Sequence, residues 1–177
     1  MTQTNQITPL NVLYLSNWVG NPYMDLLAKN LAGQKVRVTE QFRQLFFWPQ
    51  LLTEPQPKIL HLQTLHYIFV SRQPLYFWLK FLIFIAQLYG LKALGVRTIW
   101  TVHEWKDKNS EGQHDLSSRK AKILGRALDG VITHCQSTRQ EMIQALGLGN
   151  HPKKVFVIPH GNYIGHYTNS MGQTEAR

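Results

Sequence analysis

The stretch Arg97–Glu104, which reads RTIWTVHE, predicts the fold more clearly than any other part of the sequence. It starts with a short run of β-branched and aromatic residues, the composition of a buried strand, and it ends in polar residues. A helical pattern over Asp115–Leu128 follows, and then a second short apolar run, Gly130–Thr133 (GVIT). Two strands joined through a helix pair in parallel, because the helix returns the chain to the edge where the first strand began.

The same alternation extends outward to both ends of the chain. We expect strands at Leu10–Leu15, Lys35–Thr39, Lys58–Leu62, Arg97–Val102, Gly130–Thr133 and Val155–Ile158. The expected helices are Tyr23–Leu31 with Pro22 in its first turn, Leu75–Leu94, Asp115–Leu128, and one capped by Ser137 that runs to about Leu146; Glu40–Pro57 is expected to be a loop or a broken helix. This order predicts an α/β fold: a single Rossmann-like domain with a mostly parallel, doubly wound sheet of about six strands and helices on both faces.

The expected domain covers residues 10–163. Residues 1–9 are predicted to form a polar N-terminal tail, and residues 164–177 a polar tail or a truncated interdomain linker. The N-terminus lacks the basic-then-apolar form of a signal peptide, so we expect a cytoplasmic protein. The single cysteine, Cys135, excludes an intrachain disulfide and a cysteine-rich zinc site.

The composition is that of a folded, basic protein. Hydrophobic residues make up 44% and charged residues 16%, which argues against a disordered chain. The formal net charge of +9 suits an anionic partner. A membrane surface at the inner face is the favoured partner and nucleic acid is not expected, while a basic surface without a specific partner stays open.

The segment Leu75–Leu94 is apolar almost all round, as expected for a helix in a core or in a membrane. A membrane span needs about 20 predominantly apolar residues. Lys80, Gln87 and Lys92 interrupt this segment, and a lysine at the bilayer centre costs up to about 3 kcal/mol. We therefore expect a core helix with an exposed apolar edge that reaches the headgroup region.

Ligands of such sheets bind outside the carboxyl ends of the strands, so the residues there are the candidates for a site. The loop after the first strand contains Trp18, Gly20 and Asn21 and leads into a helix N-terminus, where backbone N–H groups can approach an anion or a sugar hydroxyl. A plain connecting turn is the alternative there. After the third strand, His66 is placed to face a cleft, whereas His61, within the strand, is expected to be packed and hydrogen-bonded.

The fourth and sixth strands end in further candidates. His103 and Glu104 put an imidazole beside a carboxylate, a pair suited to proton transfer or hydrogen bonding. His160 and Gly161 follow the sixth strand, and His134 follows the fifth. Although the chain has eight histidines, no HxxxH or HxH spacing occurs, so no metal site is predicted.

These strand ends resemble the N-terminal, acceptor-side domain of GT-B glycosyltransferases of the exopolysaccharide and glycolipid-assembly type. The resemblance rests on the loop Trp18–Tyr23, the TVHE of Thr101–Glu104, the segment Ala127–Thr133 and the VIPHG of Val157–Gly161. It covers about residues 10–163.

The resemblance also implies roles for individual residues. His103 would lie near the acceptor and the reacting sugar, with Glu104 as its catalytic neighbour. The loop at Gly20 would approach the donor phosphates or the acceptor, with Trp18, Asn21 and His66 also binding substrate. His160 and Gly161 would form the hinge into a second domain. A nucleotide-sugar would be the co-substrate, and no other cofactor or metal is implied.

The expected function is the acceptor-side half of a glycosyltransferase, which moves a sugar from a nucleotide-sugar to a lipid-linked or polysaccharide acceptor. In the family most donor contacts come from a C-terminal domain. Three interpretations of the chain stay open: it is a fragment, it is half of a split enzyme with a separate donor-binding chain, or it has no transfer activity. We expect no transfer by this chain alone. The alternative is a non-catalytic, membrane-peripheral module that docks on a separate transferase chain. A nucleotide-dependent oxidoreductase is disfavoured because GxGxxG is absent after the first strand.

Overall fold

The computed structural model describes residues 8–16, 22–42, 45–51, 55–65, 73–103 and 118–163. Within them the strands are β1 (Leu10–Ser16), β2 (Val36–Phe42), β3 (Ile59–Leu62), β4 (Arg97–Thr101), β5 (Gly130–Thr133) and β6 (Val155–Val157). The helices are α1 (Pro22–Ala32), α2 (Trp48–Leu51), α4 (Pro74–Ala93), α5 (Ser118–Ala127) and α6 (Gln136–Ala145), with a short 3-10 helix at Pro152–Lys154.

The strands form one six-stranded sheet in the order β2-β1-β3-β4-β5-β6. Every neighbouring pair in this sheet is parallel. The predicted α/β fold with a parallel sheet is therefore confirmed. The direction of strand addition reverses at β1, which has β2 on one side and β3 on the other, and such a reversal opens a crevice at the carboxyl ends of the strands.

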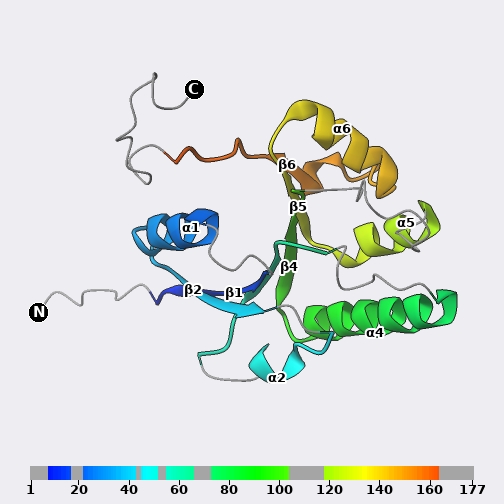
Figure 1. Ribbon diagram of the computed structural model, residues 1–177, viewed down its shortest axis with the longest axis horizontal. Coiled ribbons are helices and arrows are strands. Elements are labelled where there is room, and N and C mark those ends of the chain that lie inside the picture. The colour runs from blue at the N-terminus through cyan, green and yellow to red at the C-terminus, as the bar shows by residue number, and fades with distance from the viewer. Residues whose placement is uncertain are drawn as a thin grey trace, which may run out of the picture.

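The two faces of the sheet are covered unequally. Successive residues of a strand point to opposite faces. Leu13 and Leu15 of β1 therefore join a large core with α4, α5 and α6, whereas Val12 and Tyr14 join a smaller cluster with Met24 of α1. Figure 1 shows α1 over one face and α4, α5 and α6 over the other. In the part of the chain that the structure describes, α1 is the only helix over its face.

Apart from shifts of one residue, β2 and α6 differ from the sequence-based expectation, and part of the segment after Glu40 forms a short helix. Strand β2 extends past Thr39 to Phe42, because it pairs with the whole length of β1 up to Ser16. The expected loop or broken helix after Glu40 contains the four-residue helix α2. The predicted cap at Ser137 was wrong: α6 begins at Gln136, and Cys135 occupies the N-cap position without a side-chain cap hydrogen bond.

Helix α4 buries one side and exposes the other, as the sequence predicts. The buried side consists of residues three or four positions apart, namely Phe77, Phe81, Phe84, Leu88 and Leu91. The exposed edge carries Leu75, Tyr76, Leu79 and Leu82. By length and composition, with a mean hydropathy of 1.4, α4 is also apolar enough to cross a membrane, but the core helix of a soluble protein passes the same test.

A polar residue on the buried side of α4 attaches the segment before α2. The Gln87 side-chain oxygen accepts a hydrogen bond from the Phe47 backbone N–H at 3.2 Å. Its amide nitrogen donates to the Leu45 carbonyl at 2.7 Å. Gln87 is 7% exposed, so these bonds satisfy a buried amide and at the same time position the chain next to α4.

Asp129 connects the start of β5 to β4 and α4. Its carboxylate accepts a hydrogen bond from the Thr98 backbone N–H at 3.0 Å and forms ion pairs with Lys92 and Arg97, each at 3.2 Å. Burial by itself would raise the pKa of this carboxyl, but the hydrogen bonds from Thr98, Lys92 and Arg97 lower it below its usual value. Asp129 is thus held as a carboxylate that orients the strand.

Close packing of α5 against the end of α6 requires a glycine at position 125. A Cβ atom at Gly125 would lie 2.5 Å from the Leu146 carbonyl oxygen, so the two helices would have to separate. Overpacking of this kind costs about 1–3 kcal/mol. Alanine at the same place would gain only about 1 kcal/mol in helix propensity.

We therefore expect Gly125→Ala to lower the Tm of the chain, measured by circular dichroism or differential scanning fluorimetry. Gly149→Ala is the matched control, because a Cβ at Gly149 would meet no atom within 4 Å. Equal Tm values for the two variants would contradict the close contact between α5 and α6.

Candidate functional site

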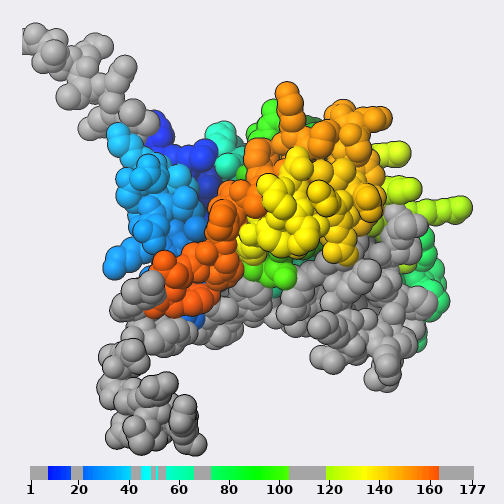
Figure 2. All heavy atoms as spheres, turned by 90° about the horizontal axis from the view of Figure 1, so that it is seen from above, coloured from blue at the N-terminus to red at the C-terminus, as the bar shows by residue number. Residues whose placement is uncertain are grey.

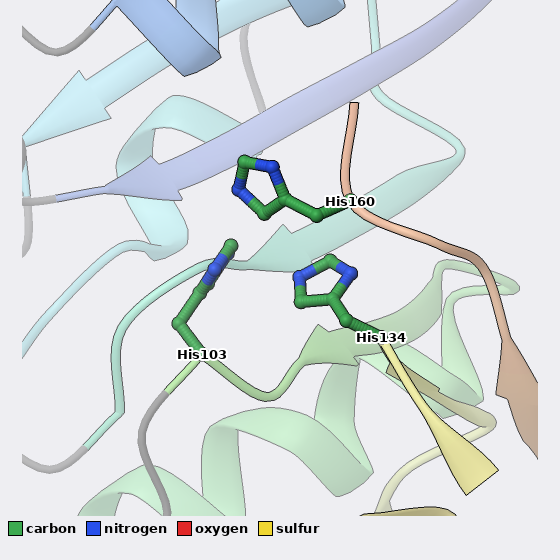
Figure 3. A group of neighbouring side chains, drawn as sticks. All are labelled: His103, His134 and His160. Carbon is green, nitrogen blue, oxygen red and sulfur yellow. The ribbon is translucent and has the colours of Figure 1, made fainter. Parts of the chain in front are cut away.

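Parallel pairing brings the carboxyl ends of β3, β4, β5 and β6 to one edge of the sheet. Gln63 follows β3 directly, His103 lies two residues beyond β4, and His134 follows β5 directly. His160 lies three residues beyond β6, in an irregular segment that ends the described part of the chain. Figure 3 shows the three histidines converging from these separate strand ends.

The three imidazole rings form a compact cluster. The ring centroids of His103 and His134 are 5.1 Å apart, and those of His134 and His160 are 5.0 Å apart. One ring nitrogen from each histidine lies within 4.8 Å of the other two. Tyr23 of α1 borders this cluster, with its ring 5.1 Å from that of His103 and 4.9 Å from that of His160.

A chain of hydrogen bonds that runs from His61 through Gln63 orients the ring of His103. The Gln63 amide nitrogen lies 3.3 Å from Nε2 of His61, which also contacts the Thr101 hydroxyl at 2.7 Å. The Gln63 side-chain oxygen lies 3.0 Å from Nε2 of His103. An amide nitrogen only donates and an amide oxygen only accepts, so Nε2 of His61 bears a lone pair and Nε2 of His103 bears the proton.

Backbone carbonyls determine the tautomers of the other two rings. Nδ1 of His134 lies 2.9 Å from the Ile158 carbonyl, and Nδ1 of His160 lies 2.7 Å from the Gly161 carbonyl. A carbonyl only accepts, so both Nδ1 atoms are protonated, and in the neutral form of each ring Nε2 is the nitrogen that bears the lone pair. Nε2 of His134 is buried and has no hydrogen-bond partner.

The electrostatic environment keeps His103 neutral. Burial lowers the pKa of His103 to about 3, and the neighbouring His134, His160 and His61 add to the shift. Burial also lowers the pKa of His61 to about 4. Both imidazoles are therefore uncharged near pH 7, where they can accept or donate a proton but carry no fixed positive charge.

An apolar groove of about 520 Å³ runs along the face of the sheet that bears α1 and reaches this cluster. Its walls are mainly aliphatic and aromatic, with Val12, Ile59, Ile99 and Ile132 from the sheet and Leu27 from α1 among them. The polar groups along it include His61, Thr101 and His134. Its described lining contains no Lys, Arg, Asp or Glu side chain.

The segment after β6 forms one border of this groove. Ile158, Pro159, Gly161, Asn162 and Tyr163 all line it. Figure 2 shows the segment, in orange, crossing from α6, in yellow, to α1, in light blue. The same segment therefore carries His160 into the cluster and closes one side of the groove.

The structure brings together only some of the residues predicted from the sequence. His103 and His160 meet at the sheet edge, and Gly161 lines the adjoining groove. The other predicted site residues, Trp18, Gly20, Asn21, His66 and Glu104, lie outside the described residues.

Sequence reasoning assigned no role in the site to Gln63, His134 or Tyr23, although it noted that His134 follows a strand. Gln63 and His134 each directly follow a strand, and this position in the sequence could have indicated a role in the site. Tyr23 lies in the first turn of α1, where the sequence alone indicates only a residue on an amphipathic helix.

Comparison with known protein families matches residues 28–162 to Glycosyltransferase Family 4. The matched region includes β2 to β6 and the three histidines of the cluster. No curated protein matches the chain. Because the match covers most of the sequence, the chain belongs to Glycosyltransferase Family 4 and contains a glycosyltransferase domain.

Proposed function

We propose that this domain supplies the acceptor side of a sugar transfer from a nucleotide-sugar donor. The observation that carries the proposal is an apolar groove that reaches a cluster of three imidazoles, among them the neutral His103, at the carboxyl edge of a parallel sheet. That edge is where ligands of such sheets bind. The family membership supports the reaction class.

The lining of the groove favours an acceptor with an apolar part. A nucleotide diphosphate calls for cationic side chains, a metal ion or clustered backbone N–H groups, as at a helix N-terminus. The described lining has no charged side chain and is dominated by aliphatic residues. A lipid-linked acceptor in an exopolysaccharide or glycolipid assembly reaction matches this chemistry, with its lipid portion along Ile59 and Ile99 and its hydroxyl near the histidines.

His103 is our candidate for the catalytic imidazole at the acceptor. Its ring is half-buried, neutral and oriented by Gln63, so its unprotonated nitrogen, Nδ1, can accept a hydrogen bond from an acceptor hydroxyl. Glu104 is proposed as its carboxylate neighbour from the sequence, and the loop at Trp18, Gly20 and Asn21, with His66, is proposed to complete the substrate contacts.

Donor binding is assigned to a second domain, on this polypeptide or on another. Transfer requires that donor and acceptor be held together, so that the reaction becomes effectively unimolecular. His160 and Gly161 are proposed as the hinge towards that domain, and their position shortly after the last strand, β6, supports this role.

Helix α4 supports a peripheral contact with the cytoplasmic face of a membrane. Its exposed edge includes Leu75, Leu79 and Leu82, which are 78%, 53% and 57% exposed. An apolar helix edge on a protein of net charge +9 suits an anionic bilayer surface. The same observation favours the second candidate function, a non-catalytic membrane-peripheral module that docks on a separate transferase chain.

The catalytic proposal predicts that His103→Ala, in the transferase completed with its donor-binding domain, lowers turnover by about 10²-fold or more, the contribution typical of a positioned acid–base group. Sugar transfer to the acceptor is the measurement. His151→Ala is the matched control, because His151 is exposed and lies outside the cluster. His103→Asn should show the same loss, and unchanged turnover in both His103 variants would remove this residue from the site.

The assignment of the donor to a second domain predicts that the purified 177-residue chain does not turn over a nucleotide-sugar. Release of nucleoside diphosphate and formation of glycosylated acceptor are the measurements. Turnover by this chain alone would contradict the division between donor and acceptor sides.

The membrane proposal predicts that the double variant Leu79→Gln, Leu82→Gln binds less to vesicles of phosphatidylcholine with phosphatidylglycerol. Sedimentation with the vesicles measures binding. Phe156→Gln is the matched control, because Phe156 is an equally exposed apolar residue on β6, at 53%. If the double variant sediments as the unmodified chain does, α4 is not the contact surface.

A further inference from the structure

The cluster of His103, His134 and His160 has the composition of a metal site. Each histidine offers one ring nitrogen, and these three atoms lie within 4.8 Å of one another. They come from the ends of β4, β5 and β6, which the parallel sheet holds side by side (Figure 3). The rigid sheet thus positions three imidazoles around a common point.

The hydrogen bonds to Gln63 and to two backbone carbonyls each engage one nitrogen of a cluster histidine. A metal ion binds the unprotonated nitrogen of a neutral imidazole. The bonds to Gln63 and to the carbonyls of Ile158 and Gly161 take one protonated nitrogen from each ring. The lone pair therefore lies on Nδ1 of His103 and on Nε2 of His134 and His160.

The hydrogen-bond acceptors of the three rings are of the kind found next to metal-binding histidines. Such histidines almost always donate their second ring nitrogen to a carboxylate, a backbone carbonyl or water, which fixes the ring and its tautomer. His134 and His160 do so to backbone carbonyls, and His103 does so to the Gln63 side-chain oxygen.

Nε2 of His134 gives a second, independent indication. It is buried and has no hydrogen-bond partner. A buried polar atom without a partner is unfavourable, and each case in a folded protein calls for a physical explanation. A bound cation would satisfy this lone pair.

We propose that His103, His134 and His160 bind one divalent transition-metal ion, with Zn²⁺ as the first candidate. Imidazole nitrogen is a good ligand for zinc, copper, iron and nickel, whereas magnesium and calcium prefer oxygen. The cluster contains no carboxylate among the described residues. Three protein ligands leave a fourth tetrahedral position open to water or to an oxygen of a bound molecule. Because the ion would occupy the Nδ1 lone pair of His103, an acceptor hydroxyl in the metal-loaded site would meet this fourth position and not His103 directly.

Binding requires a modest contraction of the cluster. Ligand nitrogens on one tetrahedral zinc ion lie about 3.3 Å apart, given Zn–N distances of about 2.0–2.1 Å. The separation of up to 4.8 Å must therefore shorten. His160 can supply this movement, because it is exposed and belongs to the irregular segment after β6, whereas His103 and His134 are half-buried at strand ends.

The test is a titration of the metal-stripped 177-residue chain with ZnCl₂, followed by isothermal calorimetry and by elemental analysis after dialysis. We expect saturable binding of one zinc ion per chain. His160→Ala should weaken binding by about 100-fold or more, because loss of a partner that merely orients a ligand already costs about 10–100-fold. His134→Ala should have an effect of the same size.

The control variants separate this site from surface binding and from unfolding. His151→Ala removes an exposed histidine outside the cluster and should leave zinc binding unchanged. His160 is exposed, so its replacement should preserve the circular dichroism spectrum. Absence of zinc binding, or equal binding by the unmodified chain and by folded His160→Ala and His134→Ala, would overturn the proposal. The readout is metal binding, so it does not depend on the proposed sugar transfer.

Discussion

Parallel backbone pairing along β1, β3, β4, β5 and β6 is the constraint on which the site depends. In a parallel sheet all the strands end at the same edge, so residues far apart in the chain become neighbours once their strands pair. Gln63, His103, His134 and His160 owe their proximity to this geometry. The apolar core with α4, α5 and α6 stabilises the sheet from one side.

The fold could be predicted from the sequence because its local signals and its long-range packing agree. The runs that became β4 and β5 are short, β-branched and bounded by helix patterns, and the structure places them within one residue of their expected bounds. The end of β2 was less predictable, because its last residues, up to Phe42, are polar or charged for the most part and are held by pairing with β1. The start of α6 was predicted wrongly because the side-chain type was a misleading signal. Ser137 has a side chain suited to an N-cap, but the backbone places Cys135 at the N-cap position.

The candidate site could be predicted only in part. The sequence indicates His103 and His160 because each follows a strand, and the ends of parallel strands lie together in the folded sheet. The spacing of the histidines along the chain predicts no metal site, because such spacing reveals only ligands that share one helix or one hairpin. Here each imidazole comes from a different strand, so local spacing contains no trace of the cluster. The orienting role of Gln63 also depends on two partners on neighbouring strands, His61 and His103.

The amide of Gln63 has a consequence for how protons are placed in this domain. It faces His61 with its nitrogen and His103 with its oxygen, so one planar group sets the tautomers of both rings. If the amide turned over by half a rotation, donor and acceptor would be exchanged, and each imidazole would have to move its proton to the opposite nitrogen. The two rings are therefore coupled through a single torsion angle, and the buried His61 helps to decide which nitrogen the half-buried His103 presents.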